Sequence, residues 1–321
     1  MRPIPPLPYL APWYRLACGS GRVVLEYGDR VVCLEGAAAE RLVPALLPLL
    51  DGTRTVDEIA DVLGEAVRPA VDLVLQELCE HDLLEAGPPP PPDVPRPAAD
   101  AAALLTALRP GAERLADTAA AVAACSVALV GGGASAYEIA RLLRVAGAGV
   151  EWREEPVAGV DLVVCAPAPK ELPCLSAWNE QALERLQPWL QVLPFNGRFG
   201  AVGPLYLPGD TGCYECFRRR RAASLASPGE LELLEAIPAW YPSSPAVDAV
   251  LGGLAAQLVL HWLVLGDHYV PAAFYAFELV PTLSLSVHHL HRVPRCDACS
   301  GVADVAPPLP WFKEVPVAGG G

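Results

Sequence analysis

Short runs of alternating hydrophobic and polar residues mark the beginning of the chain. Residues 22–35 read RVVLEYGDRVVCLE, in which two β-branched runs flank Tyr27-Gly28-Asp29. This pattern predicts a β-hairpin. Leucines at helical spacing then predict a helix over residues 37–50, which Asp51-Gly52 ends.

Two more helices follow at short intervals. Thr55 is followed three residues later by Glu58, and this capping-box pattern predicts the start of a helix. Pro69 stands in the first turn of a third helix, predicted over residues 68–80. The apolar residues of that helix share one face at a spacing of three to four: Val71, Val74, Leu75 and Leu78.

A short strand predicted near residues 83–85 completes an α+β, winged-helix-like domain over residues 1–87. Five consecutive prolines follow, and such a run favours a semi-rigid polyproline II spacer. We therefore predict a proline-rich linker over residues 88–100. A second domain is predicted over residues 101–306, and a mobile tail over residues 307–321.

Strands alternate with helices in the second domain. A buried strand over residues 127–130 runs into Gly131-Gly132-Gly133, and a helix follows over residues 135–146. Further strands are predicted at residues 149–152 and 161–164, and this alternation favours a parallel α/β sheet of Rossmann type. Near the end, residues 273–292 alternate in a way that predicts two antiparallel strands.

Charge and hydropathy exclude several classes of partner. The net charge of −14 repels phosphate backbones, so no nucleic-acid partner is expected. The most apolar run, residues 249–265, contains Gln257 and His261 and is short for a bilayer span, so it predicts a buried helix. The first residues lack the apolar core of a signal peptide. We therefore expect a cytoplasmic protein without membrane contact.

Four of the ten cysteines form two CxxC pairs: Cys213 with Cys216, and Cys296 with Cys299. Each CxxC turn points two thiolates at one position about 2.3 Å from a shared ion, and two turns complete a closed tetrahedron. This spacing predicts a structural zinc site without an open coordination position. Unrelated cysteines and an iron–sulfur cluster are the alternatives. The other six cysteines are expected to fill the core.

The first domain resembles the PqqD-like family of peptide-recognition elements. The resemblance is carried by the hairpin, by LLDGTRTVDEIADVL (residues 49–63) and by VDLVLQELCEHDLLE (residues 71–85). It implies that a leader peptide adds a strand to the hairpin edge and lies between the second strand and the third helix. The expected peptide-binding residues are Arg30, Val31, Val32, Cys33, Leu34, Arg68, Val71, Leu75 and Leu78. DNA binding, the other use of a winged helix, would require a basic recognition helix, and the third helix carries more acids than bases.

The second domain resembles the ThiF-like adenylating enzymes. The resemblance is carried by VALVGGGASAYEIARLL (residues 127–143), PGDTGCYECF (residues 208–217) and the closing CDAC. The glycine turn alone is weak support for a phosphate site, because a tight strand-to-helix turn also needs glycine. Active members carry an Asn-x-x-Arg element after the second strand, whereas EWREE (residues 151–155) runs directly into Pro156. They also carry an Asp where this chain has Cys165.

Because these nucleotide-binding groups are missing, no ATP, no catalytic residue and no nucleotide-binding residue are expected. The whole chain resembles the Ocin-ThiF-like partner proteins of azoline-forming pathways. This resemblance implies a non-catalytic subunit that brings a precursor's leader peptide to a YcaO-type cyclodehydratase. An active adenylating enzyme is the alternative, and a homodimer is left open. The role of Arg218 to Arg221 is also open between a solvated helix face and contact with a leader or a partner.

Overall fold

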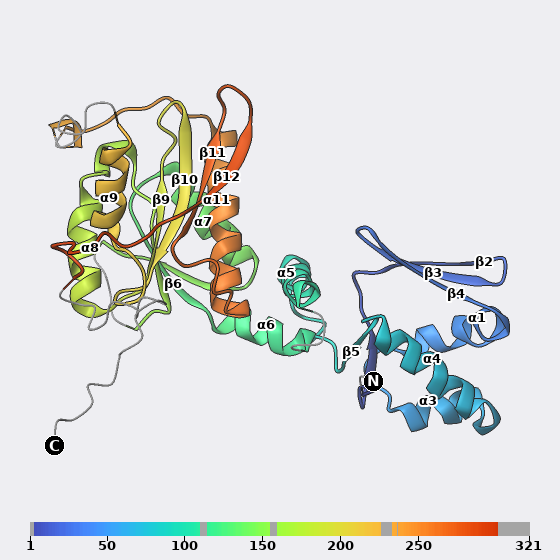
Figure 1. The fold of residues 1–321 in the computed structure, drawn as a ribbon. Helices are drawn as coiled ribbons and strands as arrows, with labels where there is room; N and C mark the ends of the chain where they lie inside the picture. The colour runs from blue at the N-terminus through green and yellow to red at the C-terminus, as the bar shows by residue number, and fades with distance from the viewer. Residues whose placement is uncertain (1–2, 110–113, 155–158, 226–232, 236, 301–321) are drawn as a thin grey trace, which may run out of the picture. The chain divides into compact units, whose positions relative to one another are not determined.

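The computed structural model describes residues 3–109, 114–154, 159–225, 233–235 and 237–300 (Figure 1). The predicted tail over residues 307–321, and the Glu155-Pro156 step used above, lie outside the described residues. Contacts divide the chain into two compact units. The first comprises residues 1–125 with 143–149 and 263–266, and the second comprises the remainder.

A three-stranded antiparallel sheet with strand order β2-β3-β4 lies in the first unit. Its strands are β2 (Arg15–Gly19), β3 (Arg22–Tyr27) and β4 (Arg30–Glu35). The predicted hairpin over residues 22–35 is confirmed as β3 and β4. Strand β2 was not predicted, because all five of its residues are exposed and no buried alternation marks it. A separate antiparallel pair joins β1 (Pro8–Leu10) to β5 (Leu84–Ala86).

Buried residues of the helical segments between residues 43 and 79 share one hydrophobic core with β3 and β4. The single helix predicted over residues 37–50 is wrong, because Pro44 and Pro48 lack the N–H that a continuous helix needs. The segment divides into α1 (Ala37–Arg41), α2 (Val43–Leu46) and the 3₁₀ turn η1 (Leu47–Leu49).

The next two helices are as predicted. Helix α3 (Val56–Leu63) begins at a complete capping box between Thr55 and Glu58. After the 3₁₀ turn η2 (Glu65–Val67) comes α4 (Arg68–Glu80), whose Val71, Leu75 and Leu78 lie in one core with residues of β3 and α3.

Helices α5 (Arg96–Leu108) and α6 (Leu115–Ala124) follow the proline run. They pack together, and the hydroxyl of Thr106 donates a 3.0 Å hydrogen bond to that of Thr118. Helix α5 begins inside the segment expected as a linker, and both helices group with the first unit. The domain limits drawn from the sequence therefore stay predictions.

A seven-stranded mixed sheet forms the second unit, in the order β12-β11-β10-β9-β8-β6-β7. The pairs β6–β8 and β8–β9 are parallel, whereas β9–β10, β10–β11 and β11–β12 are antiparallel. The expectation of a parallel α/β sheet is thus correct for one half of the sheet. The strands are β6 (Ser126–Val130), β7 (Gly149–Trp152), β8 (Leu162–Cys165), β9 (Trp189–Leu193), β10 (Phe199–Tyr206), β11 (Ala273–Glu278) and β12 (Ser284–His289).

Helices cover both faces of this sheet (Figure 1). Helices α8 (Cys174–Arg185) and α9 (Tyr214–Ala223) lie on one face, and α7 (Ala134–Val145) and α11 (Pro245–Leu260) lie on the other. A π-helical turn, His261–Leu265, extends α11. By length and composition this extended helix is the one described helix that could cross a membrane. It packs on β10, where a Cβ on Gly200 would approach Leu251 to 2.6 Å, as expected of a core helix.

Candidate functional site

A groove of about 300 Å³ lies between β4 and α4 in the first unit. It occupies the place where the sequence predicted a peptide groove. Small and apolar side chains form most of its wall, and Glu35 and Glu77 add two carboxylates. The lining residues are Cys33, Leu34, Glu35, Ala38, Ala39, Val43, Ala70, Leu73, Val74 and Glu77.

Strand β4 is an edge strand, and no strand pairs with its outer side within the described residues. A two-residue turn joins β3 to β4, which makes Tyr27 and Arg30 the closing hydrogen-bonded pair. Hydrogen-bonded and non-bonded pairs alternate along an antiparallel ladder. Val32 and Leu34 therefore bond to β3, while the N–H and C=O groups of Val31 and Cys33 point outward. This edge can accept an added strand.

Helix α4 presents other residues to the groove than the sequence predicted. Val71, Leu75 and Leu78 were expected to form the apolar wall or, for some of them, to belong to the domain core, and their side chains are fully buried in that core. Helical periodicity explains this position, because the most apolar stripe of a helix faces the core. The neighbouring stripe faces the groove and includes Ala70, Leu73 and Glu77.

Three other predicted residues also face elsewhere. Val32 is 6% exposed and belongs to the core. Arg30 forms an ion pair with Asp82 at 3.4 Å and does not line the groove. Arg68 lies outside the groove as well, held by Asp57 at 2.7 Å and Asp72 at 3.2 Å.

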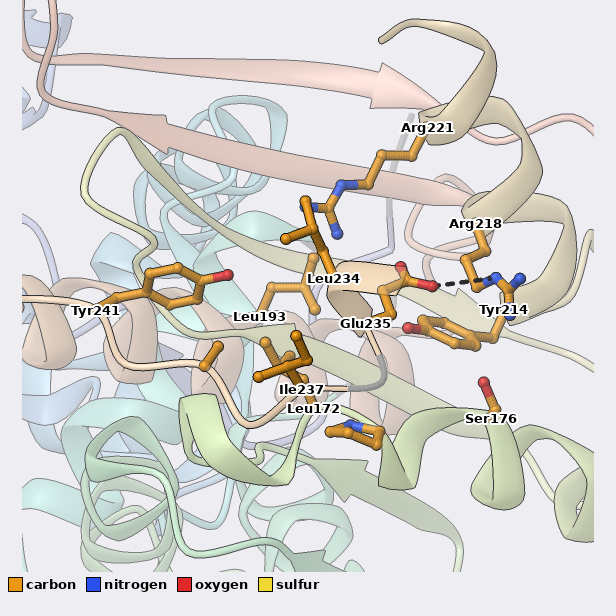
Figure 2. Close-up of a pocket in the computed structure, with 12 residues that line it drawn as sticks. Leu172, Ser176, Leu193, Tyr214, Arg218, Arg221, Leu234, Glu235, Ile237 and Tyr241 are labelled. Atoms are coloured by element: carbon orange, nitrogen blue, oxygen red, sulfur yellow. Dashed lines mark ion pairs between the residues drawn. The ribbon is translucent and has the colours of Figure 1, made fainter. Parts of the chain in front are cut away.

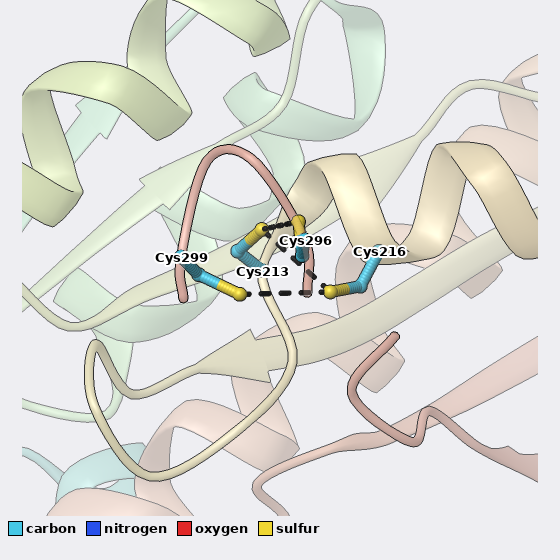
Figure 3. A group of neighbouring side chains, drawn as sticks. All are labelled: Cys213, Cys216, Cys296 and Cys299. Atoms are coloured by element: carbon cyan, nitrogen blue, oxygen red, sulfur yellow. Dashed lines mark hydrogen bonds between the residues drawn. The ribbon is translucent and has the colours of Figure 1, made fainter. Parts of the chain in front are cut away.

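The four CxxC cysteines come together in the second unit (Figure 3). Cys213 and Cys216 lie at the start of α9, and Cys296 and Cys299 lie in the loop that follows β12. All four are buried, and their sulfurs lie within 4.8 Å of one another. Side chains 80 residues apart in sequence thus form one cluster.

The sulfur spacing fits a tetrahedral metal ion. Four sulfurs at about 2.3 Å from a central zinc would lie about 3.8 Å apart. The separations are 3.9 Å for Cys213–Cys216, 3.8 Å for Cys213–Cys296 and 3.7 Å for Cys216–Cys299. A disulfide would need about 2.05 Å, so the cluster is a set of free thiols able to hold a metal.

Hydrogen bonds favour the thiolate form of one cysteine in this cluster, Cys216. The Cys213 thiol donates to the Cys216 sulfur, which lowers the pKa of Cys216 to about 4 and raises the pKa of Cys213. The backbone N–H of Val293 also donates to the Cys216 sulfur at 3.3 Å. Burial raises the pKa of Cys299 to about 12. A bound cation would stabilise the remaining thiolates.

Two arginines of α9 also connect this helix to the loop after β12. Arg219 bonds to Asp297, between the second pair of cysteines, at 2.5 Å. Arg220 donates to the carbonyl oxygens of His291 at 2.6 Å and Arg292 at 3.2 Å. These two side chains tie the loop after β12 to α9, a role that sequence reasoning did not assign.

A cleft of about 570 Å³ lies at the carboxyl ends of β6 and β8. Because β7 and β8 flank β6 on opposite sides, this is the switch point at which open α/β sheets bind ligands. Its walls include Gly131, Gly132, Trp152 and Trp178. The side chains of Tyr137 and Trp152 pack here with their ring centroids 5.0 Å apart.

The glycine loop in this cleft is filled by a side chain of the protein itself. Glu171 Oε2 accepts the N–H of Gly132 at 2.8 Å and the N–H of Ala168 at 2.9 Å. A carboxylate thus occupies the position where the loop would otherwise present N–H groups to an anion. A Cβ on Gly131 or Gly133 would lie 2.7 Å from the carbonyl oxygen of Ala166, so close packing alone requires these two glycines.

Sequence reasoning missed Glu171. The available signal was weak: a proline at the start of a short helix, followed two residues later by a glutamate. Cys165, noted as a departure from active adenylating enzymes, is buried, and its thiol bonds to that of Cys174. That hydrogen bond and burial raise the pKa of Cys165 well above its usual value.

Comparison with known proteins finds likeness among solved structures. No family profile matches the sequence, and no curated protein matches it. Among solved structures, a heterocyclase in complex with substrate and cofactor matches 92% of this chain with 23% identity and a TM-score of 0.70. The heterocyclase TruD matches 92% with 24% identity and a TM-score of 0.70. E. coli MccB with ATP matches 91% with 12% identity and a TM-score of 0.61.

These matches differ in how much of the other protein is covered. The chain spans 39% and 43% of the two heterocyclase chains, but 99% of the MccB chain. At these identities the likeness concerns the fold. The chain therefore has a mixed α/β fold that it shares with heterocyclases and with MccB, together with a buried four-cysteine cluster that could hold a metal.

Proposed function

We propose that this chain binds the leader peptide of a ribosomally made precursor and delivers it to a YcaO-type cyclodehydratase for azoline formation. In this proposal the chain is a non-catalytic scaffold that works in the cytoplasm. The main supporting observation is the free edge of β4 beside an apolar groove. The fold shared with heterocyclases over 92% of the chain adds to this support.

The groove suits an extended peptide. The outward N–H and C=O groups of Val31 and Cys33 would pair with the peptide backbone, as in other cases of strand addition. Leu73 is 73% exposed and offers an apolar contact to alternate side chains of the peptide. Backbone pairing would provide affinity, and the apolar wall would provide specificity.

Zinc at the cysteine cluster is the second part of the proposal. Four buried thiols leave no open position, so the ion would act on stability and not on a substrate. It would join α9 to the loop after β12 and hold the second unit in shape.

Binding of the leader tests the main proposal. The full chain is titrated into the fluorescein-labelled leader of a short precursor, which we expect to be encoded beside this chain, and polarisation is read. We expect saturable binding, together with azoline formation by the YcaO-type partner that depends on this chain. Azoline formation at an unchanged rate without this chain would refute the delivery role.

Glu171 supports the proposal that ATP chemistry is absent, and it yields a prediction. Glu171→Ala would leave the N–H groups of Gly132 and Ala168 without their carboxylate. We expect a loss of about 1–3 kcal/mol in the free energy of unfolding. Inorganic phosphate should restore part of it by binding the exposed N–H groups. Thermal melting with and without phosphate, at matched ionic strength in chloride, provides the measurement.

The wild-type chain is the control for this variant. Its melting temperature should respond equally to phosphate and chloride, because Glu171 fills the loop. An equal response of the two proteins would contradict the role given to Glu171.

An adenylating enzyme remains the second candidate, since MccB, solved with ATP, is matched over 99% of its length. Incubation of the chain with ATP, labelled pyrophosphate and the precursor separates the two functions. We expect no exchange above background. Peptide-dependent exchange would assign catalysis to the cleft and overturn the non-catalytic part of the proposal.

A further inference from the structure

A cavity of about 550 Å³ lies in the second unit, outside the cleft and the cysteine cluster (Figure 2). The start of α8, the end of β9, one face of α9 and five residues further along the chain surround it, namely Leu234, Glu235, Ile237, Ala239 and Tyr241. Its volume is in the range of small-ligand and peptide-anchor sites. Leu172, Leu193, Leu234 and Ile237 give it an apolar wall.

Two arginines of α9 line this cavity, and they differ in their partners. Arg218 is neutralised by Glu215 at 3.5 Å and Glu235 at 3.4 Å. The side chain of Arg221 forms no hydrogen bond or ion pair with the residues that the structure describes. Because Arg219 and Arg220 are committed to the loop after β12, Arg221 is the member of the arginine run available for an external anion.

The direction of the Arg221 side chain also suits contact with an external ligand. Figure 2 shows the guanidinium group of Arg221 and the hydroxyl group of Tyr241 pointing into the cavity. Leu234 and Ile237 are 65% and 62% exposed, so their apolar surfaces are open to a ligand. A guanidinium group binds a carboxylate through two parallel hydrogen bonds. The cavity therefore combines one group that can bind a carboxylate with an adjacent apolar surface.

We propose that this cavity binds a peptide segment in which a carboxylate side chain stands next to apolar side chains, with Arg221 as the anchor. Polar groups of Ser176 and Tyr241 lie among the apolar residues, which suits the mixed polar and apolar character of a peptide. The chain carries a net charge of −14, so most of its surface would repel an acidic segment. Attraction is therefore expected only where a positive group such as Arg221 is available. The site is separate from the β4 groove and does not depend on leader binding there.

A synthetic peptide tests the proposal on the full chain. The probe is a fluorescein-labelled, end-blocked pentapeptide that alternates leucine and glutamate, and its partner has glutamine in place of glutamate. We expect saturable polarisation with the glutamate peptide and at least about tenfold weaker binding of the glutamine peptide. Arg221→Gln should weaken binding of the glutamate peptide by about tenfold, because the bidentate contact is lost.

Matched variants separate this contact from a general change in charge. Arg96→Gln on α5 removes the same charge at a side chain that is 92% exposed and should leave the affinity unchanged. Arg221→Lys should recover part of the affinity, and Ile237→Asn should reduce it severalfold. A thermal melt of each variant checks that it is folded.

Several results would overturn the proposal. They are no saturable binding, equal affinity for the two peptides, or equal losses in Arg221→Gln and Arg96→Gln. Efficient displacement of the probe by decanoate would assign the cavity to a fatty acid instead. If Arg221→Gln melts early, the comparison of the two peptides on the wild-type chain still decides the outcome.

Discussion

Replacing Cys213 with serine should release the metal and lower the melting temperature of the second unit by about 10 °C. Serine cannot replace a thiolate ligand, and three sulfurs would leave the tetrahedron open. The ion would no longer join α9 to the loop after β12. Loss of a structural metal is among the few single changes that cost more than about 4 kcal/mol.

Elemental analysis and calorimetry provide the measurement. The purified wild-type chain should hold about one zinc, and the variant should hold less. Cys18→Ser is the control, since Cys18 is exposed on β2 and far from the cluster in sequence. A folded wild-type chain free of metal would refute the site. Bound iron with visible absorbance would show that the four cysteines hold an iron–sulfur cluster instead of zinc.

Placing a proline at Cys33 should remove most of the affinity for the leader peptide without unfolding the first unit. The N–H of Cys33 points away from β3, so proline deletes a donor on the free edge and no bond of the sheet. The pyrrolidine ring would also obstruct an incoming strand. We expect a loss of roughly tenfold to a hundredfold in affinity.

Two matched variants make this result specific. Cys33→Ser removes the thiol but keeps the N–H, and it should bind the leader as the wild type does. Val32→Pro should instead destabilise the unit, because the N–H of Val32 bonds to β3 and its side chain is buried. Fluorescence polarisation gives the affinity and circular dichroism gives the fold. Equal leader binding by Cys33→Pro and Cys33→Ser would show that the peptide does not pair with β4.

Periodicity predicted well those elements that bury one face. The hairpin, α3 with its capping box and α4 were found because apolar residues repeat at strand or helix spacing. The same signal indicated core residues of α4 as the groove wall, whereas the stripe that lines the groove includes Ala70 and Glu77. A groove wall of this kind has no periodic signature of its own.

Contacts distant in sequence were predictable only where the residue type restricts the partner. Four cysteines in two CxxC pairs have few other uses, so their meeting could be expected across 79 intervening residues. Glu171 has many possible partners, and nothing in the sequence links it to Gly132, 39 positions earlier. That the Arg221 side chain has no partner among the described residues likewise depends on the folded chain, in which its three neighbours find acceptors elsewhere.

The separation between the two cysteine pairs also sets an order of events during synthesis. At about 5–20 residues per second, a ribosome adds the 80 residues from Cys216 to Cys296 in roughly 4–16 s. During this interval the first pair has been made and its partner pair has not. Strands β11 and β12 are added within the same interval, so the metal would close the cluster after all seven strands exist. A metal cross-link would therefore secure a sheet that is already translated, and it would not guide the first steps of folding.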